Sequence, residues 1–273
     1  MAGFFGFLDF TKEGPGIKKD APKKKAFFVF FETFFRNFWR FILINVVYVI
    51  LSLPIITHGM TSAGLTNVTR NIARDKHSFG LSDFFETIRK NLKQSIIVGV
   101  LNTVITAVIG FAVYNYFFSY VNAETQSTFY LAGFAISLCI AVIFAIMQFY
   151  IYTLMITFDF KIKALYVNSF KFVFVNLWKN LLCGIILLAV YALYVTILWM
   201  FPYWSVWLSG LLIALLTLPA FRFLLIQFFT FGSIKKHIID PYYAEHPDAD
   251  IEKRRNLGLE VPEDDEYDDM AWE

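Results

Sequence analysis

The hydrophobic positions of this chain gather into long uninterrupted blocks rather than into the short-period patterns of soluble helices and strands. A bilayer-crossing helix takes about 20 mostly apolar residues, and inside lipid a helix satisfies its own backbone polar groups. Four blocks are long enough for this, at residues 95–120, 129–158, 181–201 and 204–231. A shorter block, 41–53, ends at Pro54. The pattern therefore predicts an all-α, polytopic membrane bundle.

The positions of lysine and arginine bear on the number of spans. Cytoplasmic flanks of membrane helices attract these residues, and the loops at 121–128 and 202–204 contain none of the 24. Both loops are therefore expected outside the cell. A bundle of five spans would also place Lys23, Lys24 and Lys25 outside, against the same rule.

A sixth helix within residues 55–73 removes this conflict. As a helix the segment would extend roughly 28 Å, about one hydrocarbon thickness. It is rich in Gly, Ala, Ser and Thr, which suits a helix packed inside a bundle. It is expected to be interior or re-entrant; the alternative is a short cytoplasmic helix at 61–75, with five spans and the N-terminus outside. We predict both termini in the cytoplasm and six membrane helices, at roughly 37–53, 55–74, 95–119, 129–158, 180–201 and 205–231.

The ends of the chain differ in charge from the bundle between them. Residues 1–36 are expected to be a basic cytoplasmic arm and an interfacial helix, and residues 37–240 the bundle. Twelve of the 22 acidic residues lie between Glu245 and Glu273. Because like charges repel and little apolar area is present, residues 241–273 are predicted to be a disordered cytoplasmic tail. The net charge of +2 argues against a nucleic-acid partner.

A similar stretch recurs at three places where a predicted span begins. Each combines aromatic or basic residues with one asparagine, at Asn37, Asn91 and Asn176. Each is expected to be a cytoplasmic interfacial helix that turns into a span. The spacings between the asparagines are unequal, so the pattern indicates recurrent interface chemistry or an old duplication of a helical hairpin.

Motifs that would indicate catalysis or cofactor binding are absent from the sequence. It has no Walker A loop, dinucleotide-binding glycine fingerprint, HExxH motif or CxxC motif. We therefore expect no enzyme activity, no cofactor and no metal. Cys139 and Cys183 both lie inside apolar blocks and are interpreted as buried free thiols.

Candidate functional residues lie on the small, polar helix and in the last span. His58 and Ser62 are one turn apart and share a face, as a nucleophilic pair would, although helix packing is the simpler interpretation. Arg222 is the main charge inside a predicted span, where an ionisable group suggests function. It either reaches the cytoplasmic interface or faces the interior and pairs with an acid or an anionic headgroup. The candidates on the polar helix are Thr57, His58, Gly59, Ser62, Asn67 and Arg70.

Two segments carry a resemblance to a known family. The first is Leu53-Pro54-Ile55-Ile56-Thr57-His58-Gly59 with Ala63, Leu65 and Arg70 after it, and the second is Phe84-Phe85 with Lys90-Asn91-Leu92-Lys93-Gln94. Both are similar to motifs of the YesL-like DUF624 family, integral membrane proteins of Gram-positive bacteria. The resemblance implies a multi-pass protein of the bacterial cytoplasmic membrane. It also implies a link to carbohydrate ABC importers, whose genes often lie beside those of the family.

Three functions are compatible with these observations. The first is a non-enzymatic accessory or scaffold protein that has importer subunits as partners. The second is a small transporter or lipid-handling protein, which requires a polar cavity lined by helix 55–74, Arg222 and Asn102 or Gln148. The third is an intramembrane enzyme that uses His58 or Ser62.

Overall fold

The computed structural model describes residues 26–76, 78–122, 127–201 and 203–246. In these residues the regular structure is helical throughout, without a strand. Of the predicted arm and interfacial helix (1–36) and the predicted tail (241–273), residues 1–25 and 247–273 lie outside the described residues. The elements are α1 (Ala26–Arg36), α2 (Phe38–Ser52), the 3-10 turn η2 (Ile55–Thr57), α3 (His58–Ala73), α4 (Leu81–Asn122), α5 (Thr128–Thr157), α6 (Ile162–Val175), α7 (Leu177–Met200), α8 (Trp204–Ile234), the π-turn η3 (Lys235–Ile239) and α9 (Asp240–Glu245).

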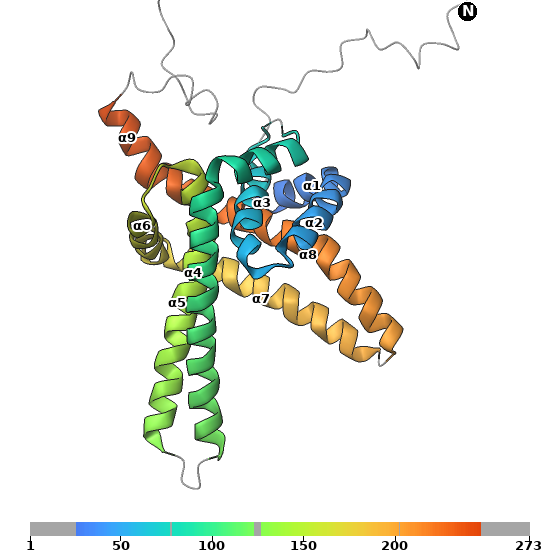
Figure 1. Cartoon of the computed structure of the whole chain (residues 1–273), viewed down its shortest axis with the longest axis vertical. Coiled ribbons are helices and arrows are strands. Elements are labelled where there is room, and N and C mark those ends of the chain that lie inside the picture. Colours follow the sequence, from blue (N-terminus) through green and yellow to red (C-terminus); the bar gives the residue numbers. More distant parts are fainter. Residues whose placement is uncertain (1–25, 77, 123–126, 202, 247–273) are drawn as a thin grey trace, which may run out of the picture.

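The helices form three antiparallel hairpins, α2–α3, α4–α5 and α7–α8 (Figure 1). The hairpins α4–α5 and α7–α8, called the long hairpins below, diverge from the end of the molecule where α1 and α9 lie. The short hairpin α2–α3 lies between them, and α3 packs against α4, α5 and α8. The interior of the molecule is therefore built around α3.

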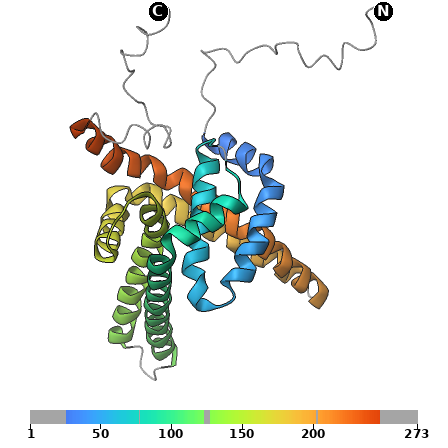
Figure 2. The same ribbon diagram turned by 45° about the horizontal axis from the view of Figure 1, so that its top comes forward.

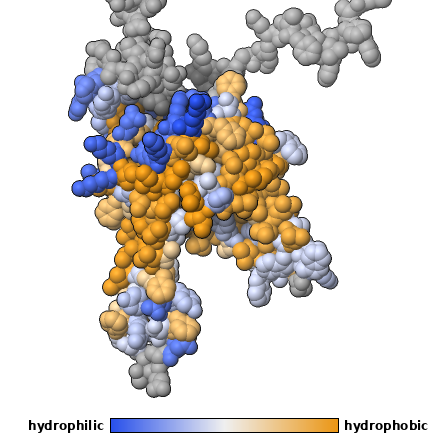
Figure 3. All heavy atoms as spheres, in the orientation of Figure 1, coloured by the Kyte–Doolittle hydropathy of each residue, from blue (hydrophilic) through white to orange (hydrophobic). Residues whose placement is uncertain are grey.

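The composition of the long helices is that of a multi-pass membrane protein. Four runs are long and apolar enough to cross a membrane: Leu81–Asn122, Thr128–Thr157, Leu177–Met200 and Trp204–Glu245. The pair α1–α2, bent by 71°, adds a fifth if it is counted as one span. The surface over the hairpins is largely apolar, and hydrophilic residues gather near α6 and α9 and at the tips of the two long hairpins (Figure 3). The helix α3 is not among the candidate spans, so the sixth span stays a prediction.

The short hairpin has the features of a re-entrant segment. Its tip is apolar and exposed, with Leu53, Ile55 and Ile56 each at least 60% accessible. Backbone groups at such a tip must be satisfied within the protein when no water is near. The hydroxyl of Thr57 does this by donating to the carbonyls of Leu51 and, at 2.7 Å, Pro54. From there α3 runs back beside α2 toward the end of the molecule where α1 lies (Figure 2).

Each of the three recurrent asparagines lies at a break between two helical segments. Asn37 separates α1 from α2, Asn176 separates α6 from α7, and Asn91 interrupts α4 with φ −111° and ψ 16°. Asn37 Nδ2 donates to the carbonyl of Thr33 at 3.0 Å, and Asn91 Nδ2 donates to that of Thr87 at 3.1 Å. These two side chains thus donate to the carbonyl four residues earlier, at the position where the helix is interrupted, whereas Asn176 Nδ2 donates to Ser233 Oγ of α8.

The helices that follow these asparagines also bury the same face. The residues four, seven and eleven positions after each asparagine are buried, a spacing that marks one side of a helix. They are Phe41, Ile44 and Tyr48 in α2, Ser95, Val98 and Asn102 in α4, and Asn180, Cys183 and Leu187 in α7. The recurrent sequence pattern therefore corresponds to a recurrent structural unit of interfacial helix, asparagine break and inward-facing helix.

One expectation about the cysteines is wrong. Cys183 is buried, as predicted, but Cys139 is exposed, and both are free thiols. The reason is its position in the first half of α5, which begins at the tip of a long hairpin. An apolar block in a membrane protein can face lipid, so hydrophobic surroundings in the sequence do not imply burial by protein.

Candidate functional site

A cavity with a volume of about 1350 Å³, called the main cavity below, lies between the two long hairpins. The helices α4 and α5 form one side and α7 and α8 the other, while Tyr48 of α2 and His58 and Ser62 of α3 also contribute. Most of the lining residues are apolar. The polar lining residues are Tyr48, His58, Ser62, Asn102, Thr103, Thr106, Tyr114, Gln148, Tyr152, Tyr191 and Arg222.

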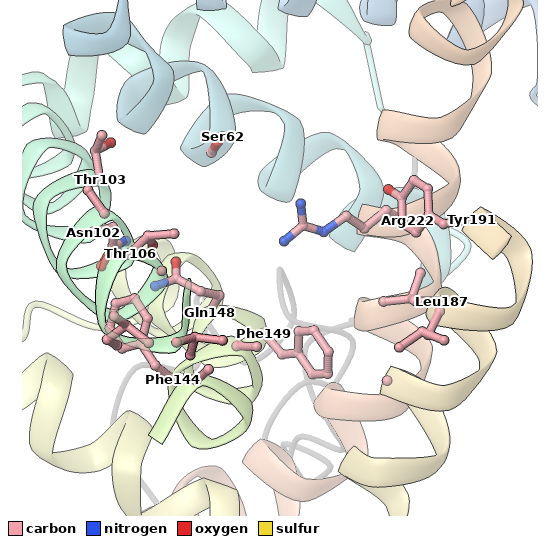
Figure 4. A pocket seen from close by; sticks show the side chains of 18 of the residues that line it. Ser62, Asn102, Thr103, Thr106, Phe144, Gln148, Phe149, Leu187, Tyr191 and Arg222 are labelled. Carbon is pink, nitrogen blue, oxygen red and sulfur yellow. The ribbon is translucent and has the colours of Figure 1, made fainter. Parts of the chain in front are cut away.

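Arg222 supplies the permanent charge of this cavity. Its side chain extends from α8 into the space between Ser62 on α3 and Gln148 on α5 (Figure 4). Among the described residues it has no hydrogen bond or ion pair, and its one aromatic contact is distant, with Cζ 5.8 Å from the ring centroid of Phe223. The described lining contains no Asp or Glu. The predicted alternative in which Arg222 faces the interior is therefore the one that the geometry favours, without an acid to pair with.

A break in α8 orients the segment that carries Arg222. Pro219 has no N–H and its ring disturbs the preceding turn, which separates the carbonyl of Leu216 from the N–H of Ala220. The Asn45 side chain fills this gap: its Nδ2 donates to Leu216 O at 2.7 Å, and its Oδ1 accepts from Ala220 N at 3.0 Å. Asn45 is fully buried, so both bonds are shielded from solvent. The short hairpin thereby holds α8 one turn before Arg222.

Two amides lie on the wall formed by α4 and α5. Asn102 is held in place, because its Oδ1 accepts from Tyr166 at 2.7 Å and its Nδ2 contacts the Tyr152 hydroxyl at 3.4 Å. Gln148 is different: its Nε2 is buried and has no acceptor in the described part of the chain. A buried donor without an acceptor is costly. Gln148 thus contributes a polar group to the cavity wall whose donor the described residues leave unsatisfied.

The candidates on α3 fall into separate groups. His58 and Ser62 both line the cavity, but no hydrogen bond joins their side chains among the described contacts. The His58 ring instead meets the Tyr48 ring edge-on, with 6.2 Å between centroids. Thr57 closes the hairpin tip, as described above. Gly59 lies against Gly99 of α4 so closely that a Cβ on Gly59 would lie 2.6 Å from the Gly99 Cα.

Asn67 and Arg70 do not line the cavity, and Arg70 is about 12 Å along the helix from Ser62. Asn67 Nδ2 donates to Thr87 Oγ1 of α4 at 2.7 Å, and Arg70 Nη2 donates to Asn67 Oδ1 at 2.7 Å. Arg70 Nη1 also donates to Thr157 Oγ1, at the end of α5, at 2.8 Å. These contacts join three helices and give Asn67 and Arg70 a structural role.

The comparison with known families covers the first part of the bundle. Residues 41–116 match the family model DUF624, described as a protein of unknown function. Residues 41–116 are called the DUF624 segment below. The match confirms the resemblance drawn from the sequence, and the DUF624 segment comprises nearly all of α2, all of α3 and most of α4. No curated protein and no solved structure matches the chain.

The cavity is shared between the DUF624 segment and the rest of the chain. The segment supplies Tyr48, His58, Ser62 and Asn102, whereas Arg222 lies outside it. Sequence reasoning named Arg222, Asn102 and Gln148 but missed Asn45 and its contact with the Pro219 break. A signal was present, because Asn45 is a strongly polar residue in an apolar block and Pro219 interrupts another. No group of His, Cys, Asp or Glu in the described ranges is arranged to hold a metal ion.

Proposed function

We propose that this multi-pass membrane protein binds an anionic amphiphile in the cavity between the long hairpins, and that it does so as a non-enzymatic, lipid-handling protein. The observation that carries the proposal is Arg222, a cation without a partner among the described residues, in a largely apolar cavity of about 1350 Å³. Pockets for drug-sized molecules are roughly 300–1,000 Å³. The space therefore suits a larger, chain-bearing molecule.

The charge of Arg222 selects for an anionic head. A cation within a membrane bundle is costly unless it meets an opposite charge or reaches water. A carboxylate or phosphate would supply the charge, and the planar guanidinium matches either group with two parallel hydrogen bonds. Gln148 lines the same cavity, and its Nε2 has no acceptor among the described residues. The apolar remainder of the lining suits the hydrocarbon part of such a molecule.

The arrangement of helices supports access from the bilayer. The long hairpins diverge, and the cavity lies between them rather than in a closed bundle (Figure 1). Their outward surfaces are apolar (Figure 3), as expected of helices that face lipid. A ligand with an acyl chain can reach Arg222 from that side without crossing water. Binding is favoured over catalysis because His58 and Ser62 are not joined by a hydrogen bond, which a nucleophile and its base require.

Binding of labelled hexadecanoate and of the matching uncharged hexadecanol to the purified protein in detergent tests the proposal. We expect the carboxylate to bind more tightly than the alcohol. Substitution Arg222→Gln should weaken carboxylate binding by about tenfold or more, equivalent to ~1.4 kcal/mol, and leave the alcohol nearly unchanged. The matched control is Arg89→Gln, which removes an exposed arginine outside the cavity. Equal binding of both probes, or an Arg222→Gln protein that binds like the wild type, would contradict the proposal.

The role in carbohydrate import is compatible with this activity. Its support is the family resemblance, which implies importer subunits as partners. Purification of the tagged protein in mild detergent tests it. Importer subunits should be recovered above the level seen with an unrelated membrane protein, and their absence would remove this part of the proposal.

We place the protein in the bacterial cytoplasmic membrane with both termini in the cytoplasm. The distribution of lysine and arginine supports this orientation, as do α1 and α9, which lie at the same end of the molecule (Figure 2). The test replaces both native cysteines and introduces Asp20→Cys or Ala123→Cys. A reagent that does not cross the membrane should label position 123 and not position 20 in intact cells. Labelling of both from outside would contradict the orientation.

A further inference from the structure

A second, polar pocket lies at the end of the molecule where α1 meets α2, and it is independent of the main cavity. Its volume is about 280 Å³, and it is formed by the Asn37 break together with the residues that follow α3. Three cations line it, Arg36, Arg40 and Lys76, against the single acid Asp75. The pocket is therefore positively charged.

The one acid is already paired. Asp75 Oδ1 accepts from Arg36 Nη2 at 2.5 Å. Lys76, in contrast, has a buried Nζ without a hydrogen-bond partner in the described residues, and Arg40 is exposed and has no ion pair among them. Burial first, and then the charges of Arg74 and Arg70, lower the pKa of Lys76 to about 8. Two positive charges, those of Arg40 and Lys76, are thus left uncompensated around one small space.

The neighbouring residues do not supply the missing negative charge. Nε and Nη2 of Arg74 and Nε of Arg70 are also buried without acceptors in the part of the chain that the structure describes. The Arg74 guanidinium instead lies over the Phe231 ring, with Cζ 3.5 Å from the centroid. Buried cationic donors without acceptors are unfavourable. An acceptor from outside the described residues would relieve this cost.

We propose that this pocket binds a phosphate group, held by Lys76 and Arg40 with Arg36 beside them. A phosphate carries up to two negative charges and three strong acceptor oxygens, which match the two uncompensated cations better than a single carboxylate does. The pocket adjoins α1, where Phe27, Phe28 and Phe35 are exposed, and Trp39 at the start of α2 is 80% exposed. Such an aromatic surface belongs at the membrane interface. The phosphate of a lipid headgroup and free phosphate share this chemistry, and both are considered below.

Three probes separate the phosphate from the rest of a lipid and identify its source. They are dioctanoyl phosphatidic acid, dioctanoylglycerol, which lacks the phosphate, and inorganic phosphate, added to the full-length protein in neutral detergent. We expect the phosphatidic acid to bind and the diacylglycerol to bind at least about tenfold more weakly. Displacement of phosphatidic acid by millimolar inorganic phosphate would identify free phosphate as a sufficient ligand. Failure to displace it would identify the lipid headgroup as the source; either result supports the site.

Variants assign the binding to this pocket. The double substitution Arg40→Gln and Lys76→Gln should weaken phosphatidic acid binding by about tenfold or more. The matched control, Arg89→Gln with Lys93→Gln, removes the same charge from exposed positions on α4 and should change binding by less than about twofold. Arg40→Gln alone alters an exposed side chain and tests the site without threatening the fold. Because the main cavity is itself proposed to bind anionic amphiphiles, these phosphatidic acid measurements are made in the Arg222→Gln background, so that a failure here is distinguishable from a failure of the proposed function.

The proposal is overturned by either of two results. One is that the double variant, verified as folded by its thermal transition, binds phosphatidic acid as the wild type does. The other is that dioctanoylglycerol binds as well as phosphatidic acid. In the second case the affinity would come from the acyl chains rather than from a phosphate.

Discussion

The helices α3 and α7 are both predicted to be membrane helices, and the protein uses them in opposite ways. Ten of the 16 residues of α3 are buried, compared with three of the 24 residues of α7. Yet α7 is far more apolar and α3 is made mainly of Gly, Ser, Thr, Asn and a few aliphatic residues. In a soluble protein the more hydrophobic helix would lie inside. Here the large apolar side chains face the lipid, and the small residues allow close helix contacts in the interior.

Glycine contacts show the difference at atomic scale. A Cβ built on Gly59 of α3 would lie 2.1 Å from the carbonyl oxygen of Ser95, and one on Gly64 would lie 2.8 Å from the Phe84 ring. A Cβ on Gly184 of α7 would meet no atom within 4 Å. The same residue type therefore serves close packing in one helix and has no steric role in the other.

The largest predicted effect is that of a single methyl group at Gly59. Gly59→Ala forces backbone of α3 and α4 apart, because the atoms that it meets belong to the Ser95 carbonyl and Gly99. We expect a loss of about 3 kcal/mol or more in the free energy of unfolding, at the upper end of overpacking effects. Gly184→Ala should be neutral, or more stable by up to about 1 kcal/mol through helix propensity. Unfolding in mixed micelles measures both, and equal effects would contradict the comparison.

Replacement of a leucine by alanine should also lower the free energy of unfolding more in α3 than in α7, although the difference should be smaller. Leu65 of α3 is 0% exposed, and Leu193 of α7 is 63% exposed. Leu65→Ala creates a cavity and should lower the free energy of unfolding by about 2–4 kcal/mol. Leu193→Ala should change it by less than about 0.5 kcal/mol, because detergent or lipid fills the space that the side chain leaves. A Leu193→Ala protein as unstable as Leu65→Ala would show that α7 is packed by protein or by another copy of the chain.

Substitutions at the contact between Asn45 and α8 test whether the short hairpin supports the cavity. Asn45→Ala leaves the Leu216 carbonyl and the Ala220 N–H unsatisfied, which should cost about 1–3 kcal/mol in the free energy of unfolding. Pro219→Ala lets these two backbone groups bond to each other. The double variant should therefore be less destabilised than the sum of the single variants. Additive effects in this double-mutant cycle would show that Asn45 acts independently of the break.

The sequence predicted the membrane class and the long spans because length and hydrophobicity alone specify them. The helices α5, α7 and α8 begin and end within a few residues of the predicted 129–158, 180–201 and 205–231. The burial of α3 was also predictable, since small residues at close spacing have little use facing lipid. Whether α3 crosses the membrane could not be predicted, because a helix of 16 residues with an exposed apolar tip is compatible with more than one depth in the bilayer.

The candidate site was predictable only in part, because its geometry depends on pairs far apart in the chain. Arg222 and Gln148 were visible as polar residues within apolar blocks. Their approach in one cavity depends on the divergence of the long hairpins, which no local pattern encodes. The contact between Asn45 and Ala220 spans 175 residues. A single sequence shows both residues of such a contact, but it does not show that they meet in the fold.

The smallest predicted effect concerns two threonine hydroxyls that differ in the kind of carbonyl to which they donate a hydrogen bond. At the tip of the short hairpin the Leu51 carbonyl accepts from the Thr57 hydroxyl, and the Pro54 carbonyl accepts from both the hydroxyl and the N–H of Thr57. Thr196 of α7 donates to the Ala192 carbonyl at 2.8 Å, within a continuous helix where the N–H four residues on already serves that oxygen. Thr57→Val should therefore cost about 1 kcal/mol in the free energy of unfolding, and Thr196→Val close to nothing. If Thr57→Val were equally harmless, the tip would be reaching water, and the short hairpin would cross the membrane rather than end inside it.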